Sequence, residues 1–150
     1  MTTIAYDGRY IACDGRAASA SGRVVSDKFK KYIEIDDMFI FFSGTVADIE
    51  PLVEIINERG SDDICEASLI VADKHGLVAV EQDDTGKIHR LPLDDVDNFA
   101  IGSGADFAVS AMDLGEDAKD AVSYAMTRDV YSGGKITVFD TETLTFVTSE

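Results

Sequence analysis

Short apolar runs that end at turn residues recur along this chain, and this pattern predicts more strands than helices. The first two runs flank Asp7-Gly8, a dipeptide that is typical of a tight hairpin turn. We therefore expect paired strands over Thr2–Tyr6 and Arg9–Cys13, which would return Asp14 beside the amino terminus. The small and polar residues of Arg16–Val25 predict a loop that leaves this hairpin.

Further strands are expected wherever apolar residues alternate or run together between turn signals. The run Met38–Phe42 is continuously apolar, which is typical of a strand that is buried on both faces. A polar link is expected over Pro92–Asn98. The other predicted strands are Lys28–Ile35, Ala67–Ala72, Gly76–Glu81, Lys87–Leu91, Phe99–Ile101, Lys135–Asp140 and Leu144–Val147.

Helical spacing of apolar residues predicts three helices, over Thr45–Arg59, Ala105–Leu114 and Glu116–Arg128. In the last of these, the inner face would carry Ala118, Ala121, Val122 and Ala125. Antiparallel strand runs with helices segregated between them indicate an α+β layered fold. A chain of 150 residues is long enough for one such domain, over 1–150.

The charge balance restricts the classes of partner. The chain has 13 basic and 29 acidic residues, a formal net charge of −16, which disfavours a nucleic-acid surface. Two cysteines do not make a disulfide framework, so a reducing compartment fits best. No run reaches membrane-spanning length and no signal-peptide pattern opens the chain, so we expect a soluble, cytoplasmic protein.

Common catalytic and cofactor patterns are weak. His75 and His89 have no cysteine partners at metal-ligand spacing, and no Ser-His-Asp set is visible, so no metal is expected. Gly102-Ser103-Gly104 precedes a predicted helix and could hold a phosphate. It lacks the further glycines or lysine of a nucleotide loop, so no cofactor is expected.

A series of short motifs carries more information together than any one of them alone. They are Thr2, Asp14-Gly15-Arg16-Ala17, Lys30-Lys31-Tyr32-Ile33-Glu34-Ile35, Ser43-Gly44, Ile101-Gly102-Ser103-Gly104 and Arg128-Asp129-Val130-Tyr131-Ser132-Gly133-Gly134. In order and rough spacing this series resembles the proteasome β-subunit family and its bacterial relative, the HslV-type peptidase. The run RDVYSGG is close to the family's RD-x-YSGG, and KKYIEI to its KK-x-IEI.

The resemblance covers essentially the whole chain and implies a fold. That fold is the N-terminal nucleophile hydrolase sandwich, four αββα layers built on two antiparallel sheets. The sequence departs from the family in two places. Its N-terminal hairpin is shorter, and the second of two helices that the family carries between Gly44 and Ala67 is missing, so one helix layer should be reduced.

The resemblance also implies the residues of a site. Removal of Met1, with no longer propeptide, would expose Thr2 as the nucleophile, with its own α-amine as general base, directly or through a water. Lys31 would supply a nearby cation and Asp14 would fix its position. Lys28 is the alternative lysine, because the length of the loop after Asp14 is uncertain from sequence, but the KK-x-IEI match favours Lys31.

The remaining implied roles surround the amine and the substrate. Ser103, Asp129 and Ser132 would form a hydrogen-bonded cluster around the amine, and the Gly44 N–H would bind the oxyanion. An apolar pocket beside Thr2 would favour an apolar side chain on the acyl side of the scissile bond. Its lining would be Ala17, Phe29, Ile33, Phe42 and Val46, unless Phe29 and Phe42 fill the pocket themselves.

The activity implied is that of a threonine endopeptidase acting on peptide or unfolded protein inside a homo-oligomeric ring, with an ATP-dependent unfoldase as a candidate partner. Two alternatives stay open at this point. One is a catalytically silent ring or interaction subunit, and the other is an N-terminal-nucleophile amidase that acts on a small molecule. Retention of Thr2, Lys31, Asp14, Asp129 and Ser132 together argues against a silent subunit.

Overall fold

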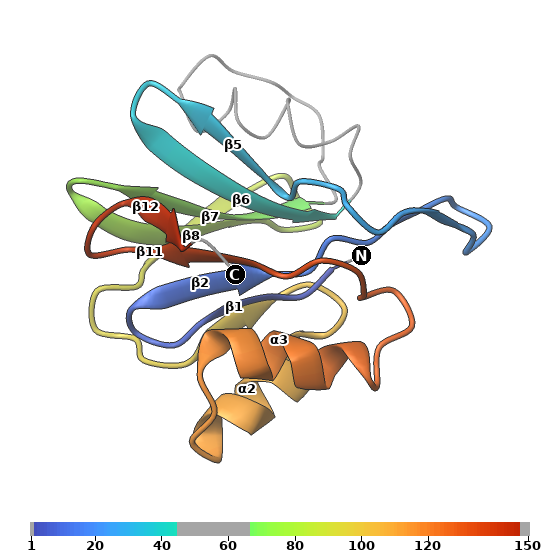
Figure 1. Ribbon diagram of the computed structural model, residues 1–150. Coiled ribbons are helices and arrows are strands. Elements are labelled where there is room, and N and C mark those ends of the chain that lie inside the picture. The colour runs from blue at the N-terminus through green and yellow to red at the C-terminus, as the bar shows by residue number, and fades with distance from the viewer. Residues whose placement is uncertain (1, 45–66, 148–150) are drawn as a thin grey trace.

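Two five-stranded antiparallel sheets lie face to face in the computed structural model, which describes residues 2–44 and 67–147 (Figure 1). The first sheet contains β1 (Ile4–Tyr6), β2 (Tyr10–Cys13), β10 (Phe99–Ile101), β11 (Thr137–Asp140) and β12 (Thr145–Val147), in the order β10-β1-β2-β11-β12. The second contains β5 (Tyr32–Ile35), β6 (Met38–Gly44), β7 (Ala67–Asp73), β8 (Gly76–Gln82) and β9 (Ile88–Pro92), which pair in sequence order.

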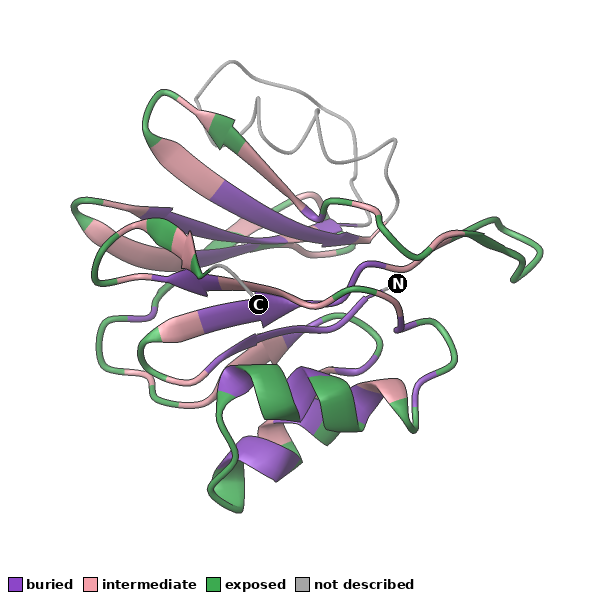
Figure 2. Ribbon diagram, viewed as in Figure 1, coloured by how far each residue is buried: buried purple, intermediate pink, exposed green. Residues whose placement is uncertain are grey.

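Strand alternation explains why the sheets stack. In β1, Ile4 and Tyr6 point between the sheets, while Ala5 points to the opposite face. In β6, Phe41 joins the cluster between the sheets, and its neighbours belong to the opposite face. Figure 2 shows that the buried segments concentrate in the facing strands. The fully or almost fully buried residues of this central cluster are Ile4, Tyr6, Ile11, Cys13, Phe41, Ile70, Ala72, Ala79, Leu93, Ile101 and Phe139.

Aromatic rings fill the middle of this layer. The ring of Phe139 lies 4.7 Å from that of Phe39, 5.3 Å from that of Phe41 and 5.0 Å from that of Phe146, measured between centroids. These separations fall in the range in which tilted and edge-on aromatic pairs attract each other beyond their burial. The ring cluster therefore joins β6 of the second sheet to β11 and β12 of the first.

Two helices, α2 (Ala105–Asp113) and α3 (Ala118–Met126), cover the outer face of the first sheet (Figure 1). Small residues make this contact close, because Ala5 and Ala12 of the first sheet pack against alanines of both helices. The side chain of Asp117 caps α3 by accepting a 2.8 Å hydrogen bond from the N–H of Asp120. The inner-face residues predicted for this helix, Ala118, Ala121, Val122 and Ala125, are all completely buried.

The antiparallel strands and the two C-terminal helices predicted from the sequence are confirmed, as is the β1–β2 hairpin. The described residues show two stacked sheets with a helix layer on the first of them. The helix predicted over Thr45–Arg59 lies outside the described residues. None of the helices in the described part of the chain is long and apolar enough to cross a membrane.

Three details of the prediction were wrong. The predicted loop over Arg16–Val25 contains a short strand pair, β3 (Ala17–Ala18) with β4 (Val24–Ser26), which projects from the body on the right of Figure 1. The strand predicted to start at Lys28 begins at Tyr32, because the backbone nearer Lys28 bonds elsewhere: Phe29 bonds to Gly15, and Asp27 bonds to Lys135. Leu93, in the predicted polar link, is completely buried between the sheets.

We expect Phe139→Ala to lower the free energy of unfolding by about 3–5 kcal/mol, because it empties the centre of the ring cluster. The matched control is Phe107→Ala on α2, whose side chain is 38% exposed and which should cost much less. Denaturant titration followed by circular dichroism measures both. Equal losses for the two variants would contradict the placement of the core.

Candidate active site

Buried polar side chains gather at one place in the described part of the chain, around the start of β1. Seven of the eight that are buried come from segments that meet there: Thr2, Thr3, Asp14, Lys31, Ser43, Asp129 and Ser132. Burial of polar groups is unfavourable unless they bond to one another. Within the described residues no buried side-chain nitrogen or oxygen lacks a hydrogen-bond partner. The cluster is therefore a fully hydrogen-bonded polar site inside an otherwise apolar core.

A buried ion pair forms one half of the cluster. Lys31 is 4% exposed, and its Nζ lies 2.9 Å from Oδ1 of Asp14, which is also buried. The same Nζ donates a hydrogen bond to Oγ1 of Thr2. Burial lowers the pKa of Lys31 from its ordinary value, and the charge of Asp14 opposes that effect. A lysine at this position holds Thr2 Oγ1 in a positive field.

The carboxylate of Asp14 is anchored by the backbone of three separate segments. Its Oδ1 accepts the N–H of Thr3 at 3.1 Å, and its Oδ2 accepts the N–H groups of Gly133 at 3.0 Å and Arg16 at 3.3 Å. With the bond from Lys31, the carboxylate has four donors. A buried charge needs such bonds to offset its desolvation.

Asp129 organises the other half. Its Oδ2 accepts hydrogen bonds from Ser103 Oγ and Ser132 Oγ, each at 2.6 Å. Its Oδ1 accepts the N–H of Tyr131 at 3.2 Å. Ser103 also lies 3.1 Å from the nitrogen of Thr2, 101 positions earlier in the chain.

The direction of each bond follows from the single proton on each hydroxyl. Ser103 and Ser132 both use their protons on Asp129. Ser103 Oγ must therefore accept from Thr2 N, and Ser132 Oγ must accept from Thr3 Oγ1, which lies 2.7 Å away. An amine at the Thr2 nitrogen would donate to Ser103 in the same way, which leaves its lone pair directed elsewhere.

Two glycines allow the loop after β10 to approach β1. A Cβ on Gly102 would lie 2.0 Å from the carbonyl oxygen of Thr2, and one on Gly104 would lie 1.9 Å from Oγ1 of Thr3. Gly102 also has a positive φ of 99°. The loop serves as a close support for the amino-terminal residues, and Ser103 between the glycines reaches Thr2.

The family resemblance assigned seven residues to catalysis. Direct hydrogen bonds join six of them in the structure: Thr2, Asp14, Lys31, Ser103, Asp129 and Ser132. Gly44 ends β6 with a positive φ of 124°, next to Ser43. The rival lysine, Lys28, is exposed, and the ion pair with Asp14 is made by Lys31.

The residues assigned to the substrate pocket divide into two groups. Phe29, Ile33 and Phe42 pack together on the outer face of the second sheet, with the Phe29 and Phe42 rings edge-on at 6.4 Å. Ala17 lies on β3, which leads away from Asp14. Val46 lies outside the described residues.

Thr3 is a site residue that the sequence reasoning missed. It is completely buried and is the only described residue whose atoms bond both Asp14 and Ser132, so it joins the two halves of the cluster. The available signal was its place in the predicted strand Thr2–Tyr6. Residues alternate along a strand, so Thr3 was expected to share a face with Ala5, which packs toward the helices.

Other chemistry at this position is less well supported. Cys13 adjoins Asp14, but its thiol is buried between the sheets, and burial raises its pKa from 9.0 to about 12. A thiol in that state is a poor nucleophile. Within residues 2–44 and 67–147, no group of three or more histidine, cysteine, aspartate or glutamate side chains is arranged to hold a metal ion.

Comparison with solved structures shows similarity of fold. One structure of Thiobacillus denitrificans BPH, in complex with epoxomicin, matches with a TM-score of 0.66 and 18% sequence identity, over 92% of this chain and 96% of that one. A second structure of Thiobacillus denitrificans BPH matches with a TM-score of 0.65 and 19% identity, over 92% and 95%. No protein-family model matches the sequence, and no curated protein matches it.

We expect the Cys13 thiol to resist alkylation in the folded protein at pH 9, where an ordinary exposed thiol of pKa 9.0 would be half ionised. The experiment uses a Cys65→Ser background and iodoacetamide, with mass spectrometry as the readout. Unfolding in denaturant should restore rapid reaction. Rapid labelling of the folded protein would show that Cys13 is accessible and would reopen its candidacy as a nucleophile.

Proposed function

We propose that this chain is a proteasome-like threonine peptidase with the N-terminal nucleophile fold, in which Thr2 attacks the peptide carbonyl. The observation that carries the proposal is the dual support of Thr2: Lys31 bonds its Oγ1, while Ser103 bonds its nitrogen. A structural threonine needs no buried cation at its hydroxyl. The match in fold to a protein solved in complex with epoxomicin supports the same reading.

The nitrogen of Thr2 must become an amine before the reaction can occur. While Met1 is attached, this atom is part of a peptide bond, its lone pair is delocalised, and it is not a base. Hydrolysis of the Met1–Thr2 bond would create an α-amine, whose unperturbed pKa is about 7.7–8.0. The cation on Lys31 favours its neutral form. Processing is thus the step that activates the site.

The proposed reaction follows the two halves of the cluster. The α-amine, directly or through a water, takes the proton of Thr2 Oγ1, and the oxygen forms a bond to the carbonyl carbon. Lys31 stabilises the developing negative charge on Oγ1, and the N–H of Gly44 is proposed to bond the oxyanion of the tetrahedral intermediate. The C–N bond then breaks, and the ammonium returns its proton to the leaving amine. Water hydrolyses the resulting ester by the same base and restores Thr2.

The supporting residues would act by position. Asp14 holds Lys31 at 2.9 Å, and Asp129 orients Ser103 so that it accepts from the nitrogen. We also propose that the apolar side chains Ala17, Phe29, Ile33, Phe42 and Val46 favour an apolar residue on the acyl side of the scissile bond. Assembly into a homo-oligomeric ring, and cooperation with an unfoldase, belong to the same proposal.

Thr2→Ala should reduce hydrolysis of a fluorogenic peptide by at least about a thousandfold, since it removes the nucleophile, while Thr2→Ser should retain measurable activity. Circular dichroism controls for folding. A peptide epoxyketone should label the wild-type protein at Thr2 and leave Thr2→Ala unlabelled, as read by intact mass. An active preparation that retains Met1 would overturn the mechanism.

The same experiment separates the alternatives. A protein that is labelled and hydrolyses a small amide, but no peptide, would be an N-terminal-nucleophile amidase. A folded protein that has lost Met1, yet shows neither labelling nor hydrolysis, would be a silent subunit.

Lys31→Met should nearly abolish peptide hydrolysis, because it removes the positive charge beside Thr2 Oγ1. The matched control is Lys28→Met, which removes the same charge from an exposed position and should keep most of the activity. Both are measured as kcat, with circular dichroism to verify the fold. Activity in Lys31→Met together with inactivity in Lys28→Met would move the catalytic assignment to Lys28.

A further inference from the structure

The basic residues of this acidic chain are unevenly distributed. Residues 15–31 contain five of the 13 lysines and arginines, namely Arg16, Arg23, Lys28, Lys30 and Lys31, and 28 of the 29 acidic residues lie elsewhere. Arg128 and Lys135 flank the second segment of the candidate site, residues 129–134. These two stretches, each with excess positive charge, adjoin the residues around Thr2.

Direct bonds hold these stretches beside the site. The N–H of Phe29 donates to the carbonyl of Gly15, and the N–H of Lys135 donates to the carbonyl of Asp27, both at 2.9 Å. The N–H of Gly15 donates to the carbonyl of Gly133, also at 2.9 Å. These contacts hold three backbone segments together around Asp14. The carboxylate of Asp14 accepts hydrogen bonds from the backbone N–H groups of Arg16 and Gly133.

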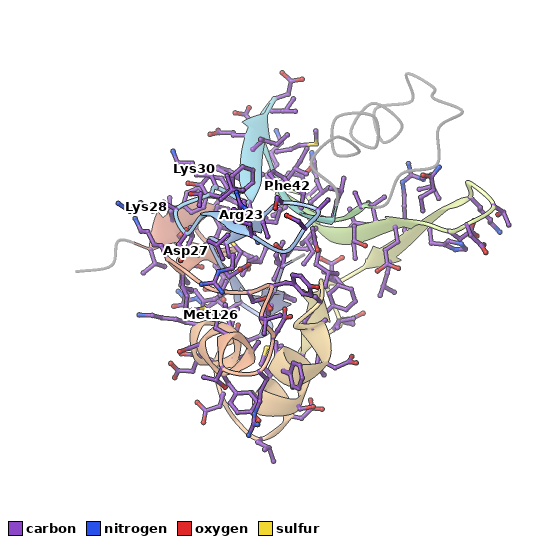
Figure 3. The ribbon with its side chains drawn as sticks, turned by 90° about the vertical axis from the view of Figure 1, so that its right-hand side faces the viewer. Arg23, Asp27, Lys28, Lys30, Phe42 and Met126 are labelled. Atoms are coloured by element: carbon purple, nitrogen blue, oxygen red, sulfur yellow. The ribbon has the colours of Figure 1, made fainter. Side chains whose placement is uncertain are left out.

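Five basic side chains of these two stretches are turned to solvent, including Arg23, which precedes β4 on the projecting strand pair. Arg23, Lys28, Lys30, Arg128 and Lys135 are all exposed, and we call these five residues the basic rim. Figure 3 views the molecule from the side on which the β3–β4 pair projects: Arg23 lies near the centre, with Lys28 and Lys30 to its left and Phe42 above.

Neighbouring acidic groups do not neutralise the rim within the described residues. Asp27 is the one acidic residue of 15–31, and it is paired with Arg16, whose Nε lies 2.8 Å from Oδ1 of Asp27. Arg16 is further held by a bond from Nη1 to the carbonyl of Val130. Asp129 and Asp14 are buried and committed to the site. None of the rim side chains forms a salt bridge with a described residue.

We propose that the basic rim makes this protein selective for acidic peptides, with glutamate or aspartate on either side of the residue at the scissile bond. This inference rests on the proposed function and adds the substrate class. The whole chain has a net charge of −16 even with the five rim residues included, so its overall field disfavours an acidic peptide, whereas the rim attracts one. Such a contrast directs an acidic ligand toward the rim and raises its local concentration there. A basic peptide would be retained on the acidic body instead.

The test uses binding as well as hydrolysis. Three fluorescein-labelled peptides share one apolar centre and carry four flanking glutamates, serines or lysines. Fluorescence anisotropy with folded Thr2→Ala protein measures their affinity without turnover, and the wild-type protein provides kcat/KM. We expect competition by the unlabelled acidic peptide, and a loss of acidic-peptide affinity as ionic strength rises from about 0.02 M to about 0.3 M.

The charge-reversal variant Arg23→Glu/Lys30→Glu should weaken binding of the acidic peptide by about tenfold and leave the serine peptide nearly unchanged. The control Lys74→Glu/Lys119→Glu changes the net charge equally at remote positions. Ala67, at the start of β7, pairs with Gly44, and Lys74 follows the other end of this strand. Lys119 lies in the first turn of α3, whereas Asp129 follows the last turn of that helix. This control should alter acidic-peptide binding by less than about twofold.

Several results would overturn the proposal. Equal affinity for the glutamate and serine peptides, or equal losses in both double variants, would show that the rim does not select substrate. A change of oligomeric state in Arg23→Glu/Lys30→Glu by light scattering, with unchanged peptide affinity, would assign the rim to contacts between copies of this chain. Failure of the proposed function gives a different result: acidic-peptide binding persists, but no peptide is hydrolysed and Thr2 is not labelled.

Discussion

The buried ion pair between Lys31 and Asp14 is the constraint on which the site depends. Two charges out of water are destabilising unless other groups replace the lost hydration. This explains why the backbone of residues 3, 16 and 133 converges on one carboxylate. The same convergence draws together β1, the segment after β2 and the loop after α3. The electrostatic requirement of one pair thus fixes the relative positions of segments that are remote in sequence.

The serine and threonine hydroxyls form a second constraint, because each has one proton to donate. Asp129 takes the protons of Ser103 and Ser132, and this makes both serines acceptors toward the amino-terminal residues. Thr3 transmits the arrangement to Asp14. A network with defined donors holds its atoms more narrowly than one in which hydroxyls can rotate between partners. Such pre-organisation is what a nucleophile with its own base requires.

The layers of the fold serve these constraints. Phe41 and Phe139 join the sheets in the middle, whereas the polar cluster occupies the end of the same layer, where β1 begins and β6 ends. The small residues between the first sheet and its helices bring α3 close, so the chain that leaves it delivers Asp129 beside Ser103. Charge follows part of the same organisation, since seven of the 13 basic residues lie in residues 16–31 and 128–135, which adjoin the site.

Strand alternation, the Asp7-Gly8 turn and the helical spacing of alanines 118, 121 and 125 were sufficient to predict most elements, because these patterns are local. Motif order was sufficient to nominate Thr2 and its partners. The sequence could not choose between Lys28 and Lys31 by geometry, reveal the role of Thr3, or find the β3–β4 pair. Each depends on the path of a loop and on hydrogen bonds between residues as far as 129 positions apart. Local periodicity determined the elements and which faces they bury, whereas only tertiary packing decided which polar groups meet, since burial forces every donor to find an acceptor wherever the chain brings one.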